Sequence, residues 1–139
     1  MELGIEIGGW CPPGKVSESG NILPEYNLIE TEKERSDRAH DIPRSLRTEY
    51  NVRFSDATLV LIPDMNETDH GTGWTLECAR YYNKPFLAID PCHPEGKTRI
   101  IEWISQVQPE TINIAGPSEK TSPGIYDQSY KLLKEIMNL

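Results

Sequence analysis

The stretch TLVLIPDMNETDHGTGWTLECARYY, residues 58–82, contains the strand, turn and helix from which the fold can be inferred. The apolar run Thr58 to Ile62 predicts a buried β-strand, and Leu76 to Tyr82 predicts a helix. A polar loop with Gly71 and Gly73 lies between them. Glycine lets the backbone approach a ligand closely, and the free N–H groups at a helix N-terminus favour an anion such as phosphate. The segment therefore predicts a site for a small phosphorylated molecule, with a plain turn capped by Thr72 as the alternative.

Further β-type runs lie at residues 4–8, 85–90 and 111–115, and helical patterns lie at 43–54, 97–108 and 125–137. Alternation of strand and helix predicts a parallel sheet with helices on both faces, formed as one domain by residues 1–139. The charge-rich segment 16–42 has no clear period. Connections of that length are usually functional or mobile, so we interpret it as an excursion over the active edge or a subunit contact.

Parallel strands place their C-terminal ends on one edge of the sheet, so the loops that follow them should be neighbours. These loops are residues 9–15, 64–73, 91–96 and 116–124, and all are polar and rich in glycine or proline. Open α/β sheets bind ligands in the crevice at that edge. We therefore expect the functional residues in these loops.

The chain of 139 residues carries a net charge of −8. An acidic protein lacks the basic footprint that nucleic acids or anionic membranes require, and no apolar run approaches the roughly 20 residues of a membrane span. The three cysteines match no disulfide or zinc spacing. With no signal peptide visible, we expect a cytoplasmic protein whose partner is a small molecule.

Nearly the whole chain carries, in order, the segments GGWCP (8–12), ILPEY (22–26), ET (30–31), RTEYNVR (47–53), SDATL (55–59), GTGWTLE (71–77), NIAGP (113–117) and PGIY (123–126). Together they resemble the molybdenum cofactor carrier family, which is related to the lysine-decarboxylase-like cytokinin-activating hydrolases. The resemblance implies an α/β fold, a Rossmann-like three-layer sandwich with a mostly parallel sheet. It also implies that the ligand is the molybdenum cofactor.

That family usually opens with a strand and a Ser-Gly-Gly-Gln-Thr-Gly-type loop, and this chain starts inside what would be the next helix. We expect the strand and half of the anion site to be absent. A sheet edge left open in this way favours a homo-oligomer, with the contact near Pro24 to Pro43 or the helix after Gly73. The family's Gly-Gly-Thr corresponds here to His70-Gly71-Thr72.

The related hydrolases carry Pro-Gly-Gly-x-Gly-Thr-x-x-Glu and cleave the N-glycosidic bond of nucleoside monophosphates. Gly71, Gly73 and Glu77 match this pattern, whereas Trp74 replaces the threonine. Glu77 would be catalytic only in a hydrolase. The missing hydroxyl favours a carrier or binding function over a nucleoside 5′-monophosphate N-glycosidase, and an inactive oligomeric remnant is the third possibility.

Other side chains could complete the site. Arg47 could neutralise a phosphate, or else lie on a solvated helix face beside Glu49. Trp10 could stack on a pterin or purine, or pack within its loop. Cys11, Cys92 and His93 lack regular spacing, so we predict no metal site. The predicted binding residues are Trp10, Arg47, His70, Gly71, Thr72, Gly73, Thr75, Glu77, Ser118 and Lys120.

Overall fold

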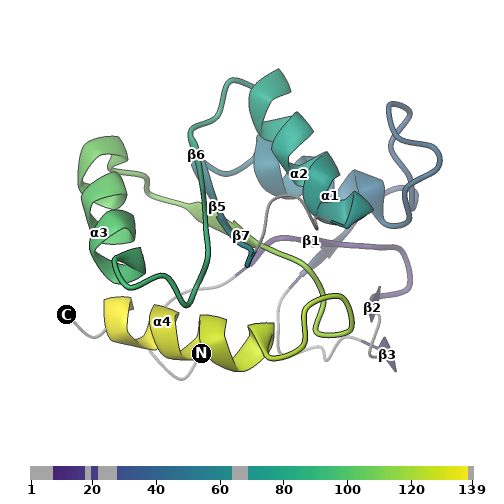
Figure 1. The fold of residues 1–139 in the computed structure, drawn as a ribbon. Helices are drawn as coiled ribbons and strands as arrows, with labels where there is room; N and C mark the ends of the chain where they lie inside the picture. Colours follow the sequence, from purple (N-terminus) through teal and green to yellow (C-terminus); the bar gives the residue numbers. More distant parts are fainter. Residues whose placement is uncertain (1–7, 18–19, 22–27, 64–68, 138–139) are drawn as a thin grey trace.

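A three-stranded parallel sheet forms the centre of the computed structural model, which describes residues 8–17, 20–21, 28–63 and 69–137. Its strand order is β6 (Phe86–Ile89), β5 (Ala57–Leu61), β7 (Ile112–Ala115). Val60 of β5 lies opposite Ala88 on one side and Ala115 on the other. The helices are α1 (Ser45–Arg53), α2 (His70–Tyr81), α3 (Gly96–Val107) and α4 (Ile125–Met137) (Figure 1).

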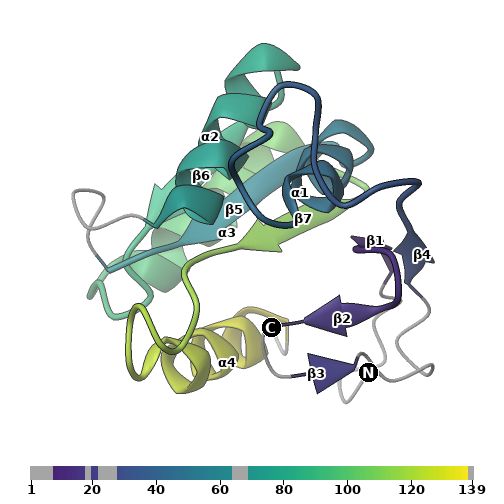
Figure 2. The same cartoon turned by 90° about the vertical axis from the view of Figure 1, so that its right-hand side faces the viewer.

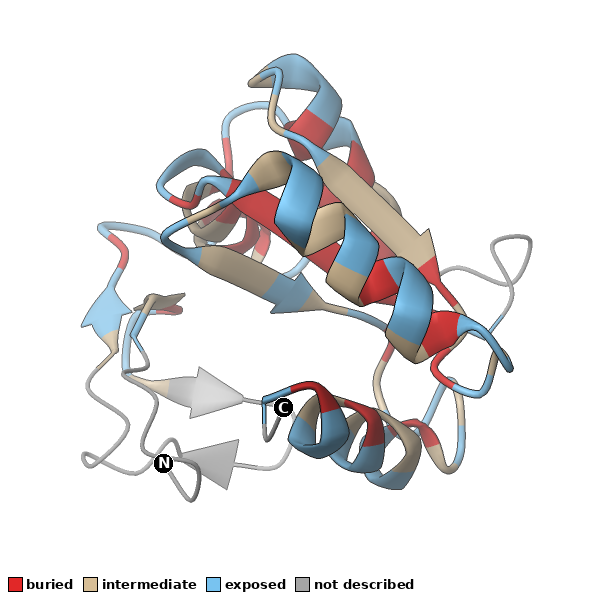
Figure 3. Ribbon diagram, turned by 90° about the vertical axis from the view of Figure 1, so that its left-hand side faces the viewer, coloured by how far each residue is buried: buried red, intermediate tan, exposed pale blue. Residues whose placement is uncertain are grey.

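Helices cover both faces of this sheet. Successive side chains of a strand point to opposite faces, so β5 packs against both helix layers. Leu59 and Leu61 pack against α3 and α4, whereas Val60 packs against Leu76 of α2. Figure 3 shows buried residues gathered where the helices meet the sheet. The predicted α/β fold, a Rossmann-like three-layer sandwich, is confirmed.

The N-terminal part forms two small paired elements apart from the main sheet (Figure 2). β1 (Trp10–Cys11) pairs in parallel with β4 (Ile29–Glu30), and β2 (Val16–Ser17) pairs antiparallel with β3 (Gly20–Asn21). The predicted run 4–8 lies outside the described residues except for Gly8, which is not in a strand. Strands of two residues have no side-chain period, so the sequence pattern could not reveal β1 to β4.

α2 begins earlier than the sequence predicted. We expected a loop through Gly73 and a helix from Leu76, but the helix starts at His70. The Asp69 carboxylate accepts a hydrogen bond from the Thr72 backbone N–H at 2.8 Å. Aspartate is a favoured N-cap, and it starts the helix before the glycines instead of after them. Residues 71–75 therefore belong to the first two turns of a helix.

The remaining predicted helices agree with the structure to within two residues at either end. α3 and α4 each have an apolar stripe that local periodicity makes visible, whereas most of the buried residues of α1 are polar. No helix within the described ranges is both long enough and apolar enough to cross a membrane.

Candidate functional site

A cleft of about 780 Å³ opens between the outer side of β7, the start of α1, β1, and the N-terminal ends of α2 and α4. Leu61, at the end of β5, and the residues that follow β7 form part of its wall. The cleft thus includes the carboxyl ends of two parallel strands, where open α/β sheets bind ligands. Three of the four predicted loops contribute to it. The loop 91–96 does not line it, because β6 lies on the far side of β5 from β7.

The N-terminus of α2 forms one end of the cleft, with His70, Gly71, Thr72 and Thr75 among the lining residues. The first N–H groups of a helix have no acceptor within the helix, and Asp69 caps that of Thr72. Thr72 is only 2% exposed, and its hydroxyl has no hydrogen-bond partner among the described residues. By contrast, the Thr75 hydroxyl donates to the Gly71 carbonyl at 3.0 Å. A buried hydroxyl without a partner is unfavourable, so the Thr72 hydroxyl is a candidate for a ligand contact.

The start of α1 contributes two half-buried arginines, Arg44 and Arg47, to the cleft wall. Arg44 is the N-cap residue of α1, with φ 58° and ψ 26°. This left-handed conformation is uncommon for a residue with a side chain, and such residues cluster at functional sites. Arg44 is not among the predicted binding residues, because no local sequence pattern indicates a left-handed backbone at an arginine.

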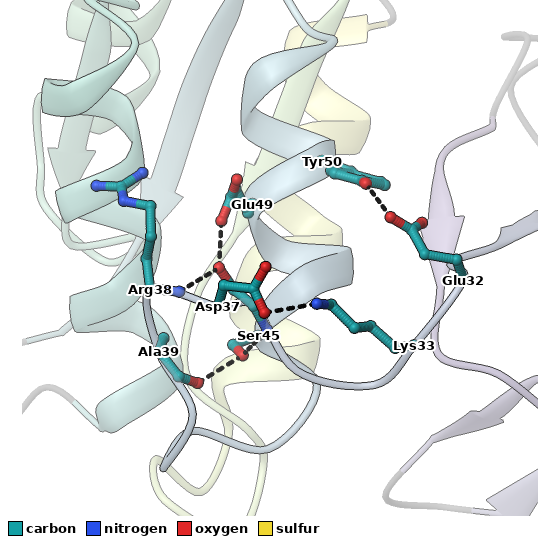
Figure 4. Close-up of polar contacts among 9 residues, drawn as sticks. Glu32, Lys33, Asp37, Arg38, Ala39, Ser45, Glu49 and Tyr50 are labelled. Atoms are coloured by element: carbon teal, nitrogen blue, oxygen red, sulfur yellow. Dashed lines mark hydrogen bonds and ion pairs between the residues drawn. The ribbon is translucent and has the colours of Figure 1, made fainter.

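A buried network holds the segment before α1 against the helices (Figure 4). The Ser45 hydroxyl donates to the Ala39 carbonyl at 2.8 Å and accepts from the Ser36 N–H at 2.8 Å. The Glu49 carboxylate accepts from the Ser36 hydroxyl at 2.5 Å and from the Tyr82 hydroxyl at 2.7 Å. Burial, together with the bond to Glu49, raises the pKa of Tyr82 to about 12. The network fixes the stretch that leads to the arginines at the cleft wall.

β1 is attached to α1 through one side-chain amide. The Trp10 N–H donates to Asn51 Oδ1 at 2.8 Å, and Asn51 Nδ2 donates to the Trp10 carbonyl at 3.2 Å. Gly9 has φ 133°, and a Cβ there would lie 2.9 Å from Asn51 Oδ1. The Trp10 ring packs edge-on against Tyr50, with centroids 4.9 Å apart, and also contacts Phe54. Although Trp10 lines the cleft, its ring is engaged in the local packing that was the alternative interpretation.

The loop between β7 and α4 forms the opposite wall. The Glu119 carboxylate accepts from the backbone N–H of Gly124 at 2.7 Å and of Tyr126 at 3.4 Å, and so caps α4. The hydroxyl of Ser118 donates to that of Thr121 at 3.0 Å. Lys120 is exposed and is not among the lining residues.

The structure brings most of the predicted binding residues together. Glu77 is exposed on α2 and outside the lining set, and Gly73 is also outside it. Trp74 is 3% exposed and packs in the core, where its Nε1–H donates to the Ser45 carbonyl at 2.9 Å. The predicted residues that line the cleft are Trp10, Arg47, His70, Gly71, Thr72, Thr75 and Ser118.

The cysteines and histidines do not form a metal site in the part of the chain that the structure describes. Cys11 and Cys78 are buried and Cys92 is exposed, and all three are free thiols. Cys78 is fully buried in the core, and this burial raises its pKa to about 12.

Comparison with known proteins gives two matches. The sequence profile of the circularly permutated YpsA SLOG family matches residues 1–137. A crystal structure from Syntrophus aciditrophicus SB, of a protein named "putative molybdenum carrier protein", matches with a TM-score of 0.85. The two sequences are 31% identical, and the match covers 97% of this chain and 81% of the other. No curated protein matches the chain.

Proposed function

Because the chain belongs to the circularly permutated YpsA SLOG family, we propose that it binds and carries a phosphorylated heterocycle in the cleft beside β7. The solved relative is named as a molybdenum carrier, so the ligand that we propose is the molybdenum cofactor, whose organic part is a phosphorylated pterin. This ligand is cargo for the protein. The net charge of −8 argues against nucleic acid as an alternative partner.

The observation that carries the proposal is made at Thr72: the residue lines the cleft, and its buried hydroxyl has no hydrogen-bond partner among the described residues. It lies in the first turn of α2, where backbone N–H groups and the helix dipole favour an anion. A phosphate oxygen would satisfy this hydroxyl. Arg44 and Arg47 line the same cleft and would add positive charge.

Calorimetric titration with a pterin monophosphate tests the phosphate position. A Cβ at Gly71 would meet only Asp69 Oδ1, at 3.8 Å, so Gly71→Val should fold and still obstruct the approach of a ligand. We expect at least about tenfold weaker binding, or roughly 1.4 kcal/mol. Glu77→Gln is the matched control on α2, because Glu77 is outside the cleft lining. Unchanged affinity in Gly71→Val would place the phosphate elsewhere.

An N-glycosidase acting on nucleoside 5′-monophosphates is the alternative from a different class. The exposed position of Glu77 and the burial of Trp74 weigh against it, because neither side chain lines the cleft. We expect weak or no release of base from AMP, measured by chromatography. Robust turnover that disappears in Glu77→Gln would replace the carrier proposal with the enzymatic one.

We further propose that the chain is a single domain that forms a homo-oligomer in the cytoplasm. Residues 28–43 of the predicted contact segment are described, and they include Ile29, which is 57% exposed. In the helix after Gly73, Tyr81 is 59% exposed. Large apolar side chains exposed at both predicted positions support a subunit contact there. An inactive remnant is the remaining alternative, and ligand binding by the purified protein would exclude it.

A further inference from the structure

We propose that Tyr126 and Ile114 form the surface on which the planar ring of the bound heterocycle stacks. This inference rests on the proposed function. It assigns a binding surface to the ring of the ligand, which the proposed phosphate position does not locate. It gives the stacking role to the start of α4 and to β7, in place of Trp10.

Exposure within the cleft singles out these two side chains. The large apolar residues that the described part of the chain exposes include only two that line the cleft, Tyr126 at 69% exposed and Ile114 at 44%. The others, such as Phe54 and Tyr81, lie outside the lining set. Ligand sites characteristically combine exposed apolar and aromatic walls with a few polar groups. An aromatic face beside a branched aliphatic side chain is a suitable surface for a flat ring.

The position of Tyr126 is supported from two sides. Its backbone N–H is bonded to the Glu119 carboxylate that caps α4. One turn further along the helix, the ring of Tyr130 lies nearly parallel to that of Tyr126, at 12° and with centroids 6.3 Å apart. The ammonium group of Lys134 lies 5.7 Å from the centroid of the Tyr130 ring. Tyr126 lines the cleft and Tyr130 does not. The stacked pair therefore leaves the ring of Tyr126 available to a ligand.

The ring of Trp10 is less suited to this role, because it packs against Tyr50 and Phe54 of α1. A ligand ring on Trp10 would have to compete with that packing. The ring of Tyr126 has a stacking partner on one side, within its own helix. The phosphate end of the ligand would then lie at the start of α2, and its ring at the start of α4. Both helix ends line the same cleft.

The test compares wild type with Tyr126→Ala, Tyr126→Phe and Tyr81→Ala, using two probes, a pterin monophosphate and AMP. Binding is followed by calorimetry and by quenching of pterin fluorescence. Removal of a stacking ring should weaken binding of the preferred probe about tenfold. Tyr126→Phe keeps the ring, so its affinity should stay within about twofold of wild type. Tyr81→Ala removes an exposed tyrosine outside the cleft and should leave the affinity for both probes unchanged.

The outcomes separate this inference from the proposed function. Tyr126 is mostly exposed, so its variants should fold, and far-UV circular dichroism checks this. If Tyr126→Ala removes only the contact with the ligand ring, inorganic phosphate should compete with the same inhibition constant in wild type and in Tyr126→Ala. Wild type that binds neither probe would overturn both proposals. If wild type binds a probe and Tyr126→Ala binds it with unchanged affinity, only the proposal of the stacking surface would be overturned. The preferred probe identifies the heterocycle as pterin or purine.

Discussion

Replacing Thr72 with Val should make the protein without ligand more stable and its ligand binding weaker. Valine has nearly the shape of threonine but lacks the hydroxyl. That hydroxyl is buried in a residue only 2% exposed, and it has no partner among the described residues. A structural threonine would give the opposite result for stability, because its hydroxyl would contribute a hydrogen bond.

The magnitudes follow from the cost of an unsatisfied buried polar group, about 1–3 kcal/mol. We expect Thr72→Val to increase the free energy of unfolding by about 1 kcal/mol, measured by urea denaturation. The lost bond to a charged phosphate oxygen should weaken ligand affinity about tenfold or more, measured by calorimetry. The two measurements should therefore change in opposite directions.

Thr75→Val is the matched control, because its hydroxyl donates to the Gly71 carbonyl within the same helix. Loss of that bond should leave stability unchanged or lower it by up to about 1 kcal/mol. If Thr72→Val is less stable than wild type, the hydroxyl has a partner in the folded protein. The argument for a ligand at this position would then be refuted.

Three further predictions concern stability and assembly. Burial raises the pKa of Cys78 to about 12, so its contribution to stability is complete below about pH 9. That contribution then falls by up to about 1.4 kcal/mol per pH unit as the pH approaches 12, and the loss of stability between pH 8 and pH 10.5, measured by urea denaturation, should be smaller in Cys78→Ala. Trp74→Thr restores the hydrolase pattern and should lower the free energy of unfolding by about 3–5 kcal/mol, because Trp74 is buried in the core. The variant should not release base from AMP, and detectable release would contradict the buried orientation of the side chain at this position. Light scattering on dilute protein should show a dimer or larger assembly; a stable monomer at micromolar concentration would disprove the oligomer proposal.

Much of the fold could be predicted from local patterns. β5 is a continuous apolar run because both of its faces are buried, and such a run is the usual signature of a parallel strand between two helix layers. α3 and α4 are amphipathic, so their period fixed their positions to within one residue. The short strands β1 to β4 could not be predicted, since two residues carry no period and their pairing depends on distant partners.

The sequence by itself determined three of the loops that line the cleft, because parallel topology places the polar loops at one edge of the sheet. Only the tertiary structure decided which of them face the cleft. The helix started by Asp69 advances about 100° per residue, so Thr72 and Thr75 face the cleft while Trp74 faces the core. Packing around α1 likewise placed Arg44 at the wall, and the loop after β7 brought in Tyr126 at the start of α4. Residue types are local information, but the directions of side chains depend on where a helix begins and what packs against it.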